Sequence, residues 1–375
     1  MDRPKVSLIL PSYNVAAYIE KTIESALWQS LDALEIICVD AGSNDGTRGI
    51  IEKMRGAAAA RGREIKLIDS DKKSYGHQIN LGIEASRGKY IAVLETDDIA
   101  SPDMYEKLYA LGEKYGADIV KSTYYDYFGE CEGCIDVSAR RASGEKGTCL
   151  IKGRASVSKL AAISAPSPVF VIEKCPELLL HHPSVWSALY SRDFLDRCGI
   201  RFPEIPGAGW ADNPFMLESL LAAERIVYTP AACYYYRKDN PASSTAMKDC
   251  RMPFMRIQDM RAVLARYESG KGARTIAPRD AGIIARTIDH RALRYAADAL
   301  ASEAFSDRND GVLIRSCLEP IPEDYLADAH VTKDEMKAYT YFTGRKVRPK
   351  ISHALSSLAY KLRYGAAYFK NRGKE

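Results

Sequence analysis

The stretch VSLILPSYN at residues 6–14 is the part of this 375-residue sequence that best indicates its fold. Residues 6–10 form an apolar run, which Pro11 and the polar residues after it interrupt. A short aliphatic run bounded by turn-forming residues predicts a buried β-strand followed by a loop. Residues 15–30 then place apolar side chains three or four positions apart, which is the spacing of one helix face. The segment therefore predicts a strand, a loop and a helix, in that order.

The same alternation continues to about residue 125. Further strand-like runs lie at residues 35–39, 65–69, 90–94 and 118–124, and helical patterns lie at 46–61, 76–87 and 103–115. Strands that alternate with helices predict an α/β fold with a mostly parallel sheet and helices on both faces. Ligands of such sheets bind beyond the carboxyl ends of the strands. Polar segments follow three of the strands, at residues 11–14, 40–47 and 97–98, so we expect a binding site at that edge.

The composition excludes several classes of protein. Hydrophobic residues make up 46% and charged residues 27% of the chain, which is typical of a globular protein and not of a disordered or fibrous one. No apolar run approaches the roughly 18 residues of a membrane span. The first apolar run is too short for a signal peptide, so we expect a cytoplasmic protein. The nine cysteines lack the spacing of a disulfide framework and are expected to be reduced.

Positive charge is concentrated in the last part of the chain. Residues 345–375 contain nine Lys or Arg and one acidic residue, whereas the rest is slightly acidic. A nucleic-acid-binding enzyme would carry its positive charge around the active cleft, so we expect no nucleic-acid partner. Between residues 350 and 370, apolar side chains recur with helical spacing and basic residues flank them. This pattern is typical of a helix lying in a membrane surface, and a helix docked on the body of the protein is the alternative.

The three polar segments read PSYN after the first strand, VDAGSNDGT at residues 39–47 and ETDD at residues 95–98. Together they resemble the donor-binding domain of glycosyltransferase family 2, which has the GT-A fold. The resemblance is close over residues 5–125 and resumes near residues 183–245. It implies an inverting transfer of a sugar from a nucleoside-diphosphate donor, with UDP expected before dTDP or GDP, assisted by Mn²⁺ or Mg²⁺. The implied acceptor is a hydroxyl of a glycan or lipid-linked molecule in surface polysaccharide assembly.

The resemblance also suggests how the chain is divided. We expect a catalytic domain over residues 1–245, with a donor half at 1–125 and an acceptor half at 126–245. Residues 246–345 would form a helical region without obvious chemistry. Residues 346–375 would form a basic amphipathic tail, which we expect at the inner face of the cytoplasmic membrane.

Pro11, Tyr13, Asn14 and Asp40 are the donor-binding residues implied in the first two polar segments. Tyr13 offers a flat ring on which a pyrimidine can stack, and Pro11 fixes the turn that presents it. Asp40 ends a buried strand, where a base N–H or a ribose hydroxyl would satisfy its carboxylate. The structural alternatives are an aromatic ring that packs on the next helix and a carboxylate that caps the turn at residues 42–46.

Asp97 and Asp98 are the expected metal-binding residues, and Asp97 is also expected to contact the donor. Successive side chains of a strand point to opposite faces, so one carboxylate can face the ribose and the other a metal ion. Carboxylate oxygens suit Mg²⁺ or Mn²⁺, which offsets the charge that develops on the leaving diphosphate. The family usually has Asp at the position of Glu95, which leaves the direct role of Glu95 open. Alternatively, the two aspartates lie in a solvated loop.

A second departure from the family pattern lies at Ile79, where many relatives have an arginine. If that arginine normally meets the diphosphate, Lys72, Lys73 or His77 would have to supply the charge. Arg237 is a further candidate for a diphosphate contact, because guanidinium groups bind phosphate oxygens well.

The sequence GWADN at residues 209–213 resembles the acceptor-side motif of the family, whose acid is the general base. Ala211 replaces the usual glutamate, and Asp212 occupies the position of the base. Inverting transfer needs one carboxylate to take the proton of the acceptor hydroxyl. The alternative for Asp212 is a helix N-cap. Trp186 and Trp210 are the expected acceptor-binding aromatics, and an ordinary core position is the alternative for Trp186.

Two other enzyme classes fit the sequence less well than a sugar transferase does. A nucleotide-dependent oxidoreductase would carry GxGxxG after the first strand, and PSYN stands there instead. A nucleotidyltransferase shares the nucleotide and metal requirements, but the sequence has no glycine-rich basic phosphate loop near the first strand. The nucleotidyltransferase and a catalytically inactive nucleotide-sugar-binding scaffold are the alternatives to a transferase.

Overall fold

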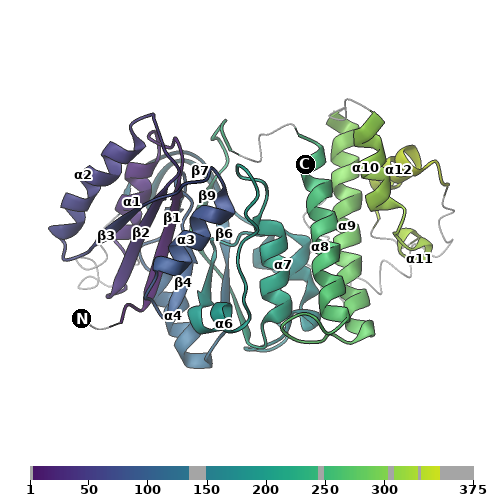
Figure 1. Ribbon diagram of the computed structural model, residues 1–375, viewed down its shortest axis with the longest axis horizontal. Coiled ribbons are helices and arrows are strands. Elements are labelled where there is room, and N and C mark those ends of the chain that lie inside the picture. The colour runs from purple at the N-terminus through teal and green to yellow at the C-terminus, as the bar shows by residue number, and fades with distance from the viewer. Residues whose placement is uncertain (1–2, 135–148, 244–248, 303–307, 328–330, 347–375) are drawn as a thin grey trace. The chain divides into compact units, whose positions relative to one another are not determined.

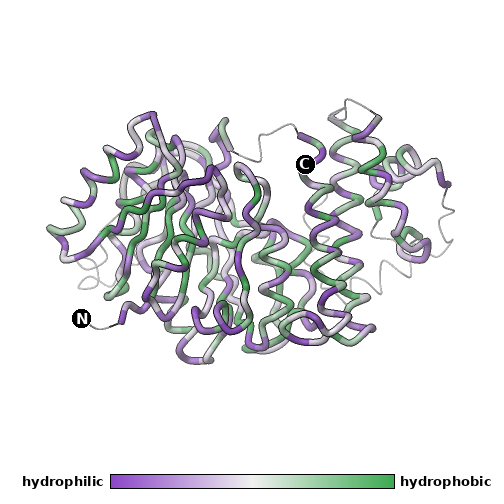
Figure 2. The backbone as a smooth tube through the Cα atoms, in the orientation of Figure 1, coloured by the Kyte–Doolittle hydropathy of each residue, from purple (hydrophilic) through white to green (hydrophobic). Residues whose placement is uncertain are grey.

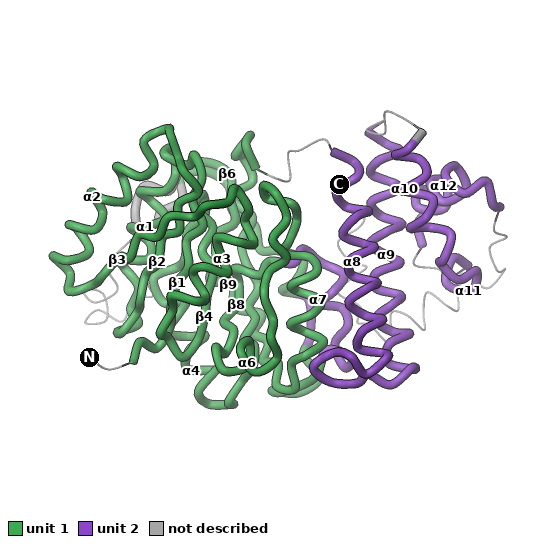
Figure 3. The backbone as a smooth tube through the Cα atoms, in the orientation of Figure 1, with its two compact units in different colours: residues 1–161, 165–171, 184–243 green, residues 162–164, 172–183, 244–375 purple. Residues whose placement is uncertain are grey.

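The computed structural model describes residues 3–134, 149–243, 249–302, 308–327 and 331–346 (Figure 1). The described chain divides into two compact units (Figure 3). Unit 1 comprises the residues up to 161 together with 165–171 and 184–243, and unit 2 comprises 162–164, 172–183 and the residues from 244 onward. The domain boundaries expected from the sequence stay predictions. Apart from residue 346, the expected basic tail lies outside the described residues.

Unit 1 is built on one sheet. Its described strands are β1 Val6–Ser12, β2 Leu34–Asp40, β3 Ile65–Asp69, β4 Tyr90–Val93, β5 Ile99–Ala100, β6 Ile119–Cys134, β7 Cys149–Val157, β8 Ala188–Ser191 and β9 Ile226–Arg237. Their order is β3-β2-β1-β4-β8-β6-β9-β5, with β7 paired to β6. Strands β1 to β4 pair in parallel, as do β6 and β9, whereas β8 runs antiparallel between β4 and β6. The mostly parallel sheet predicted from the sequence is confirmed.

The register of this sheet brings three loops to one edge. Ser12 at the end of β1 lies opposite Asp40 at the end of β2, and Ile9 pairs with Val93 at the end of β4. Every residue of β1, β2 and β4 is buried, as expected for parallel strands covered on both faces. Figure 2 shows the hydrophobic stretches that run along these strands. The polar segments after them therefore emerge side by side.

The helices of unit 1 follow the strands in the predicted order. They are α1 Ile19–Leu27, α2 Thr47–Ala59, α3 Tyr75–Ala85, α4 Met104–Tyr115, α6 Arg192–Arg197 and α7 Asp212–Ala222. Helix α3 packs on β1 and β2, and α4 packs on β6 and β9. Helix α1 begins later than residue 15, where its sequence pattern starts. In the segment before it, the backbone N–H groups of Val15 and Ala16 donate to Thr47 Oγ1 and Asp45 Oδ2 of the neighbouring loop.

Unit 2 is helical in its described part. It contains α8 Arg251–Glu268, α9 Pro278–Ser302, α10 Arg308–Leu318, α11 Glu323–Leu326 and α12 Lys333–Thr343, which confirms the helices expected in the C-terminal region. On α9, the buried Arg291 donates to the carbonyl oxygens of Leu179 and His181. Among the described residues, no helix has the length and hydrophobicity needed to cross a membrane.

Glu35 of β2 joins several parts of the sheet through one buried carboxylate. Its oxygens accept hydrogen bonds from Ser7 of β1, from Lys66 of β3 at 2.6 Å, and from the backbone N–H and Nε of Arg87 at 2.9 and 3.0 Å. Burial by itself would raise the pKa of Glu35, but the hydrogen bonds from Lys66, Ser7 and Arg87 outweigh it and lower the pKa to about 2. The charged form of Glu35 therefore stabilises the fold.

We predict that Glu35→Gln lowers the free energy of unfolding by about 2–3 kcal/mol at pH 7, because the variant leaves Lys66 and Arg87 without their buried carboxylate. Since the pKa of Glu35 is lowered on folding, this contribution is present above pH 4.5 and is lost as the pH falls toward 2. Urea unfolding at pH 7 and pH 3 measures it. Glu52→Gln, which removes an exposed ion pair with Arg55, is the control, with an expected effect below about 0.5 kcal/mol. Equal effects of the two variants would contradict this account.

Candidate active site

The loops after β1 and β2 are joined by Asn14. Its side-chain oxygen accepts the backbone N–H of Asn44 at 2.9 Å, and its own backbone N–H donates to Ser43 Oγ at 3.0 Å. Asn14 has a φ of 52°, a left-handed conformation that asparagine tolerates better than most residues. Its contacts shape the two loops, whereas the resemblance had implied a contact with the donor.

Tyr13 presents its ring at the surface of the loop after β1. The residue is 41% exposed, so part of the ring is accessible to a ligand. Lys73 Nζ lies 2.8 Å from the Tyr13 hydroxyl and 4.6 Å from the ring centroid. The carbonyl of Pro11 accepts a hydrogen bond from Thr96 Oγ1 at 3.0 Å, which ties the start of this loop to the segment after β4. Lys73 thus places a positive charge beside the exposed ring of Tyr13.

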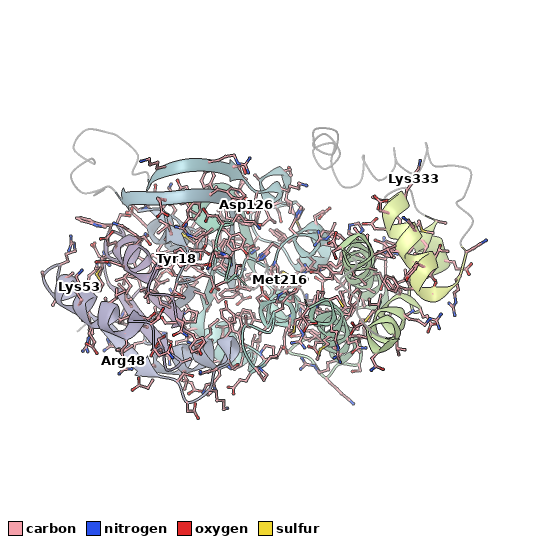
Figure 4. All side chains as sticks on the ribbon, turned by 90° about the horizontal axis from the view of Figure 1, so that it is seen from above. Tyr18, Arg48, Lys53, Asp126, Met216 and Lys333 are labelled. Atoms are coloured by element: carbon pink, nitrogen blue, oxygen red, sulfur yellow. The ribbon has the colours of Figure 1, made fainter. Side chains whose placement is uncertain are left out.

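Asp40 at the end of β2 is 2% exposed and is held by its own turn. Ser43 donates to it through both its hydroxyl and its backbone N–H, and Arg48 of α2, labelled in Figure 4, lies 3.8 Å from Oδ2. The carboxylate thus has the turn-capping contacts that the sequence left open as an alternative.

Three acids follow β4, and Asp98 is the most deeply buried of them. Asp98 has no exposed surface, and its two oxygens accept hydrogen bonds from the Tyr234 hydroxyl and the Arg237 backbone N–H, both at 2.7 Å. The Tyr234 hydroxyl also accepts the backbone N–H of Glu95 at 3.1 Å. Strand β9 therefore fixes Asp98 and the backbone of the acidic loop.

Asp97 is the more accessible aspartate. One of its oxygens accepts a hydrogen bond from the Asn240 side chain at 2.7 Å, and its backbone carbonyl accepts one from Arg237 Nε at 3.1 Å. Arg237 is itself only 6% exposed and also donates to the Gly129 carbonyl at 2.9 Å. Its guanidinium lies 4.8 Å from the ring of Tyr18. Arg237 is therefore placed to hold Asp97 rather than to extend toward a diphosphate.

Burial raises the pKa values of the three acids at this edge, and neighbouring carboxylates add to the shift for Asp98 and Glu95. Burial raises the pKa of Asp97, and burial and the neighbouring Asp97 raise the pKa of Asp98. Burial raises the pKa of Glu95 to about 8, and the charges of Asp97 and Asp212 contribute while a hydrogen bond from Tyr75 opposes them. So much negative charge in one place favours a bound cation.

A divalent cation fits this donor set if the substrate completes its coordination. Within the described ranges, no group of three or more His, Cys, Asp or Glu side chains is arranged to hold a metal ion by itself. Mg²⁺, however, is usually bound by one or two carboxylates together with substrate phosphates. Asp97 can supply such a ligand, whereas both oxygens of Asp98 are already hydrogen-bonded to β9. Asp98 is therefore placed to orient the loop.

Asp212 is the first residue of α7, and Ala211 is the N-cap residue. Its Oδ1 accepts a hydrogen bond from the Asn213 side chain at 3.0 Å. It lies close enough to Glu95 and Tyr75 to raise the pKa values of both. Trp210, two positions earlier, has a φ of 52°. A bulky residue in this conformation is strained, and such strain is commonly found at functional sites.

The loop before Asp212 is tied to the start of α3. Gly207 donates to the Lys73 carbonyl at 2.7 Å and accepts the Tyr75 backbone N–H at 2.9 Å. Asn80 of α3 accepts the backbone N–H of Phe202 and donates to its carbonyl, both at 2.9 Å. A Cβ atom on Gly76 would lie 2.2 Å from the Pro203 carbonyl oxygen, so only glycine allows this approach. The contacts bring Asp212 to the edge that carries Glu95.

Trp186 lies in the core of unit 1. It is 3% exposed and stacks on Tyr234 at 4.2 Å and on Tyr236 at 4.9 Å between ring centroids. The core alternative for Trp186 matches this geometry, in which the indole supports β9 instead of presenting a face to an acceptor.

Two of the cations considered as replacements for the missing arginine are paired with Glu204. Lys72 Nζ lies 2.8 Å from its carboxylate. His77 places Nε2 2.7 Å from Asp71 Oδ1 and Nδ1 2.9 Å from Glu204 Oε2. The His77 ring therefore bridges the loop after β3 to the segment that leads to Asp212.

Tyr75, Tyr234 and Asn240 were not singled out from the sequence, although each contacts one of the acids. Tyr234 and Asn240 belong to the segment YYYRKDN at residues 234–240. That segment had pointed only to Arg237. The run of aromatic and polar side chains in that segment was the available signal.

The fold and this acidic edge define a GT-A glycosyltransferase-like protein. Staphylococcus aureus TarS 1–349 in complex with UDP has a TM-score of 0.63 and 17% identity, over 92% of this chain and 93% of that chain. The mannosyltransferase PcManGT from Pyrobaculum calidifontis in complex with GDP-Man and Mn²⁺ has a TM-score of 0.52 and 16% identity, over 96% and 88%. These similarities confirm the GT-A-like fold.

The family described as Glycosyl transferase family 2 matches residues 7–197, and this chain belongs to that family. The uncharacterized glycosyltransferase EpsJ of Bacillus subtilis (strain 168) is 31% identical over 248 residues, which cover 64% of this chain and 63% of EpsJ. The succinoglycan biosynthesis protein ExoO of Rhizobium meliloti (strain 1021) is 26% identical over 265 residues, covering 70% and 69%. The matched regions thus span about two thirds of these relatives.

We predict that the stabilising effect of His77 is lost as the pH rises. Hydrogen bonding to Glu204 raises the pKa of His77 above 6.5, although burial opposes the shift, Asp71 adds to it and Lys72 reduces it. A raised pKa means that the contribution is complete below pH 6.5 and disappears as the pH rises through the pKa in the folded protein. The melting temperature of the wild type should therefore exceed that of His77→Gln at pH 6, and the two should converge by pH 9. Glu204→Gln should remove the same dependence. A constant difference between wild type and His77→Gln across this range would refute the charged bridge.

Proposed function

We propose that this protein is an inverting glycosyltransferase that moves a sugar from a nucleoside-diphosphate donor, UDP-linked by preference, to a hydroxyl of a glycan or lipid-linked acceptor. The observation that carries the proposal is that Asp97 and Asp212 both lie close enough to Glu95 to raise its pKa. Asp97 is held by Asn240 after β4, and Asp212 begins α7 within electrostatic range of Glu95. Membership of family 2 supports the transferase activity.

The relatives support the chemical class of the donor and of the product. The TarS structures contain UDP or UDP-GlcNAc, PcManGT contains GDP-Man with Mn²⁺, and ExoO is named for succinoglycan biosynthesis. We infer from them a nucleotide-sugar donor and a role in polysaccharide assembly.

In the proposed reaction, the carboxylate of Asp212 takes the proton of the acceptor hydroxyl as its oxygen bonds to the anomeric carbon. The bond between that carbon and the diphosphate oxygen breaks on the opposite side, which inverts the configuration. The electron pair of this bond leaves with the nucleoside diphosphate, and Asp212 later releases the proton to solvent. Mn²⁺ or Mg²⁺, held by Asp97 and the diphosphate, would act as a Lewis acid toward the leaving group.

The remaining side chains at the edge are proposed to bind the nucleotide. The exposed ring of Tyr13 can stack on the base, and Lys73 beside it can approach a phosphate. Asp40 and Asn14 would hold the loops that form the base pocket. Trp210 beside Asp212 is the proposed acceptor contact.

The place of the enzyme in the cell is part of the proposal. We propose that residues 350–370, which lie outside the described residues, attach it to an anionic membrane surface on the cytoplasmic side. The clustered Lys and Arg residues of this segment would be attracted to such a surface by about 1 kcal/mol each.

The metal assignment predicts that UDP stabilises the protein only with Mn²⁺ or Mg²⁺. At about 100 times its dissociation constant, UDP should add roughly 2.7 kcal/mol to the free energy of unfolding. Asp97→Asn should lose this stabilisation because the amide is a poorer cation ligand. Thermal unfolding with UDP, in Mn²⁺ and in EDTA, measures both. Asp196→Asn, which removes a surface pair with Arg201, is the control and should behave like the wild type. An equal shift in EDTA would exclude the metal role of Asp97.

The base assignment predicts that Asp212→Asn reduces turnover by about two to four orders of magnitude, because the amide cannot accept a proton. The dissociation constant for UDP with Mn²⁺ should stay within about threefold, since the change removes a transition-state interaction. Release of UDP from UDP-GlcNAc and UDP-glucose measures turnover, and calorimetry measures binding. Glu218→Gln on the same helix is the matched control. Turnover like that of the wild type would assign the base to another acid.

A further inference from the structure

Glu95 stands where the family usually has aspartate, and its side chain has a specific partner. The Tyr75 hydroxyl donates a hydrogen bond to Glu95 Oε1. The backbone N–H of Glu95 donates to the Tyr234 hydroxyl at 3.1 Å, so backbone and side chain are held by different tyrosines. Because aspartate is one methylene shorter, its carboxylate would not reach Tyr75 from the same backbone position.

Tyr75 is itself rigidly placed. It is the first residue of α3, after the N-cap Ser74, whose side chain accepts the His77 backbone N–H. Its own backbone N–H donates to the Gly207 carbonyl at 2.9 Å. These two attachments fix the backbone of Tyr75 relative to the loop that precedes Asp212.

A row of aromatic rings connects Tyr75 to α7. The Tyr75 ring meets Phe202 edge-on at 5.9 Å, and Phe202 stacks on Phe215 of α7 at 3.7 Å. Phe202 and Phe215 are 3% and 1% exposed, so the row is closely packed. Phe215 lies three positions after Asp212, on the same helix face. Tyr75 thus contacts Glu95 with its hydroxyl and, through Phe202, the helix that begins with Asp212.

We propose that Tyr75 is a positioning residue that holds Glu95 between the metal-binding Asp97 and the general base Asp212. The proposal rests on the proposed function. The hydrogen bond from the Tyr75 hydroxyl fixes the rotamer of the Glu95 side chain, which without it could turn toward or away from Asp97. A displacement of about 1 Å in a reacting group can reduce turnover about a hundredfold. Tyr75 therefore sets the spacing between the donor side and the acceptor side of the site.

The pairing also accounts for the departure at Glu95. In this chain the acid is longer than the usual aspartate, and Tyr75 at the start of α3 is the group that the extra methylene reaches. The two residues form a matched pair, so changing either one should have the same consequence as changing both.

The test is a double-variant cycle with Tyr75→Phe, Glu95→Asp and the combination. Tyr228→Phe is the matched control, since it removes a buried hydroxyl that donates to the Leu160 carbonyl at 2.6 Å, away from the acids. The measurements are the melting temperature, the dissociation constant for UDP with Mn²⁺, and kcat and KM for release of UDP from UDP-GlcNAc and UDP-glucose. Each single variant should lower kcat about 10- to 100-fold and leave KM and UDP affinity within about threefold. The double variant should be no slower than the slower single variant, and Tyr228→Phe should retain the wild-type kcat.

The outcomes separate this inference from the proposed function. If wild-type protein releases no UDP from either donor, the proposed function fails. If the wild type is active and Tyr75→Phe keeps its kcat, or the two single effects multiply in the double variant, the positioning role of Tyr75 is wrong. If Tyr75→Phe loses kcat together with a lowered melting temperature and a weakened affinity for UDP, the role of Tyr75 is structural only. That result would also overturn the inference.

Discussion

Repulsion among carboxylates is the constraint on which the site depends. Glu95, Asp97 and Asp98 follow one buried strand, and Asp212 lies within electrostatic range of Glu95. Charges so close together in a partly dry place are costly unless donors or a cation compensate them. Strand β9 supplies donors to Asp98, Asn240 to Asp97, and Tyr75 to Glu95. The compensation is incomplete, because the pKa values of all three acids remain raised. A bound cation would stabilise their ionised forms and could in turn hold a diphosphate.

Contacts elsewhere in unit 1 hold these hydrogen-bond donors in position. Trp186 stacks on Tyr234 and Tyr236 and so fixes the strand that holds Asp98. Helix α3 reaches both sides of the site, because Gln78 donates to carbonyls of β1 and β2 while Asn80 binds the backbone of Phe202. Buried contacts of this kind are more rigid than surface pairs, and rigidity is what a preorganised electrostatic site requires. The parallel sheet serves to bring the ends of β1, β2 and β4 together.

Local patterns in the sequence predicted the parallel sheet and the position of the site, because a buried strand followed by polar residues leaves a strong signal. They predicted Asp97 at this edge for the same reason, whereas Asp212 was implied by the resemblance to glycosyltransferase family 2. The partners of these acids could not be predicted. Tyr234 donates to Asp98 across 136 residues of sequence, and this pairing follows from the register of β9, which no local pattern encodes. In the sequence, a tryptophan of the core cannot be told from a tryptophan of a sugar-binding pocket. Only the stacking partners of Trp186 show that it lies in the core. The contact between Tyr75 and Glu95 likewise depends on how α3 docks on the sheet.

The central claim is that Asp97 and Asp212 act on opposite sides of the anomeric carbon of one bound donor. A crystal structure of the wild-type protein with Mn²⁺ and UDP, with the metal located by its anomalous scattering, tests it most directly. One Mn²⁺ should bind both the Asp97 carboxylate and the diphosphate. The base should lie against Tyr13, and the Asp212 carboxylate should face the space beyond the β-phosphate. A metal ion bound away from Asp97 would contradict this claim. A diphosphate bound on the side of Asp212 that faces away from Glu95, Asp97 and Asp98 would also contradict it.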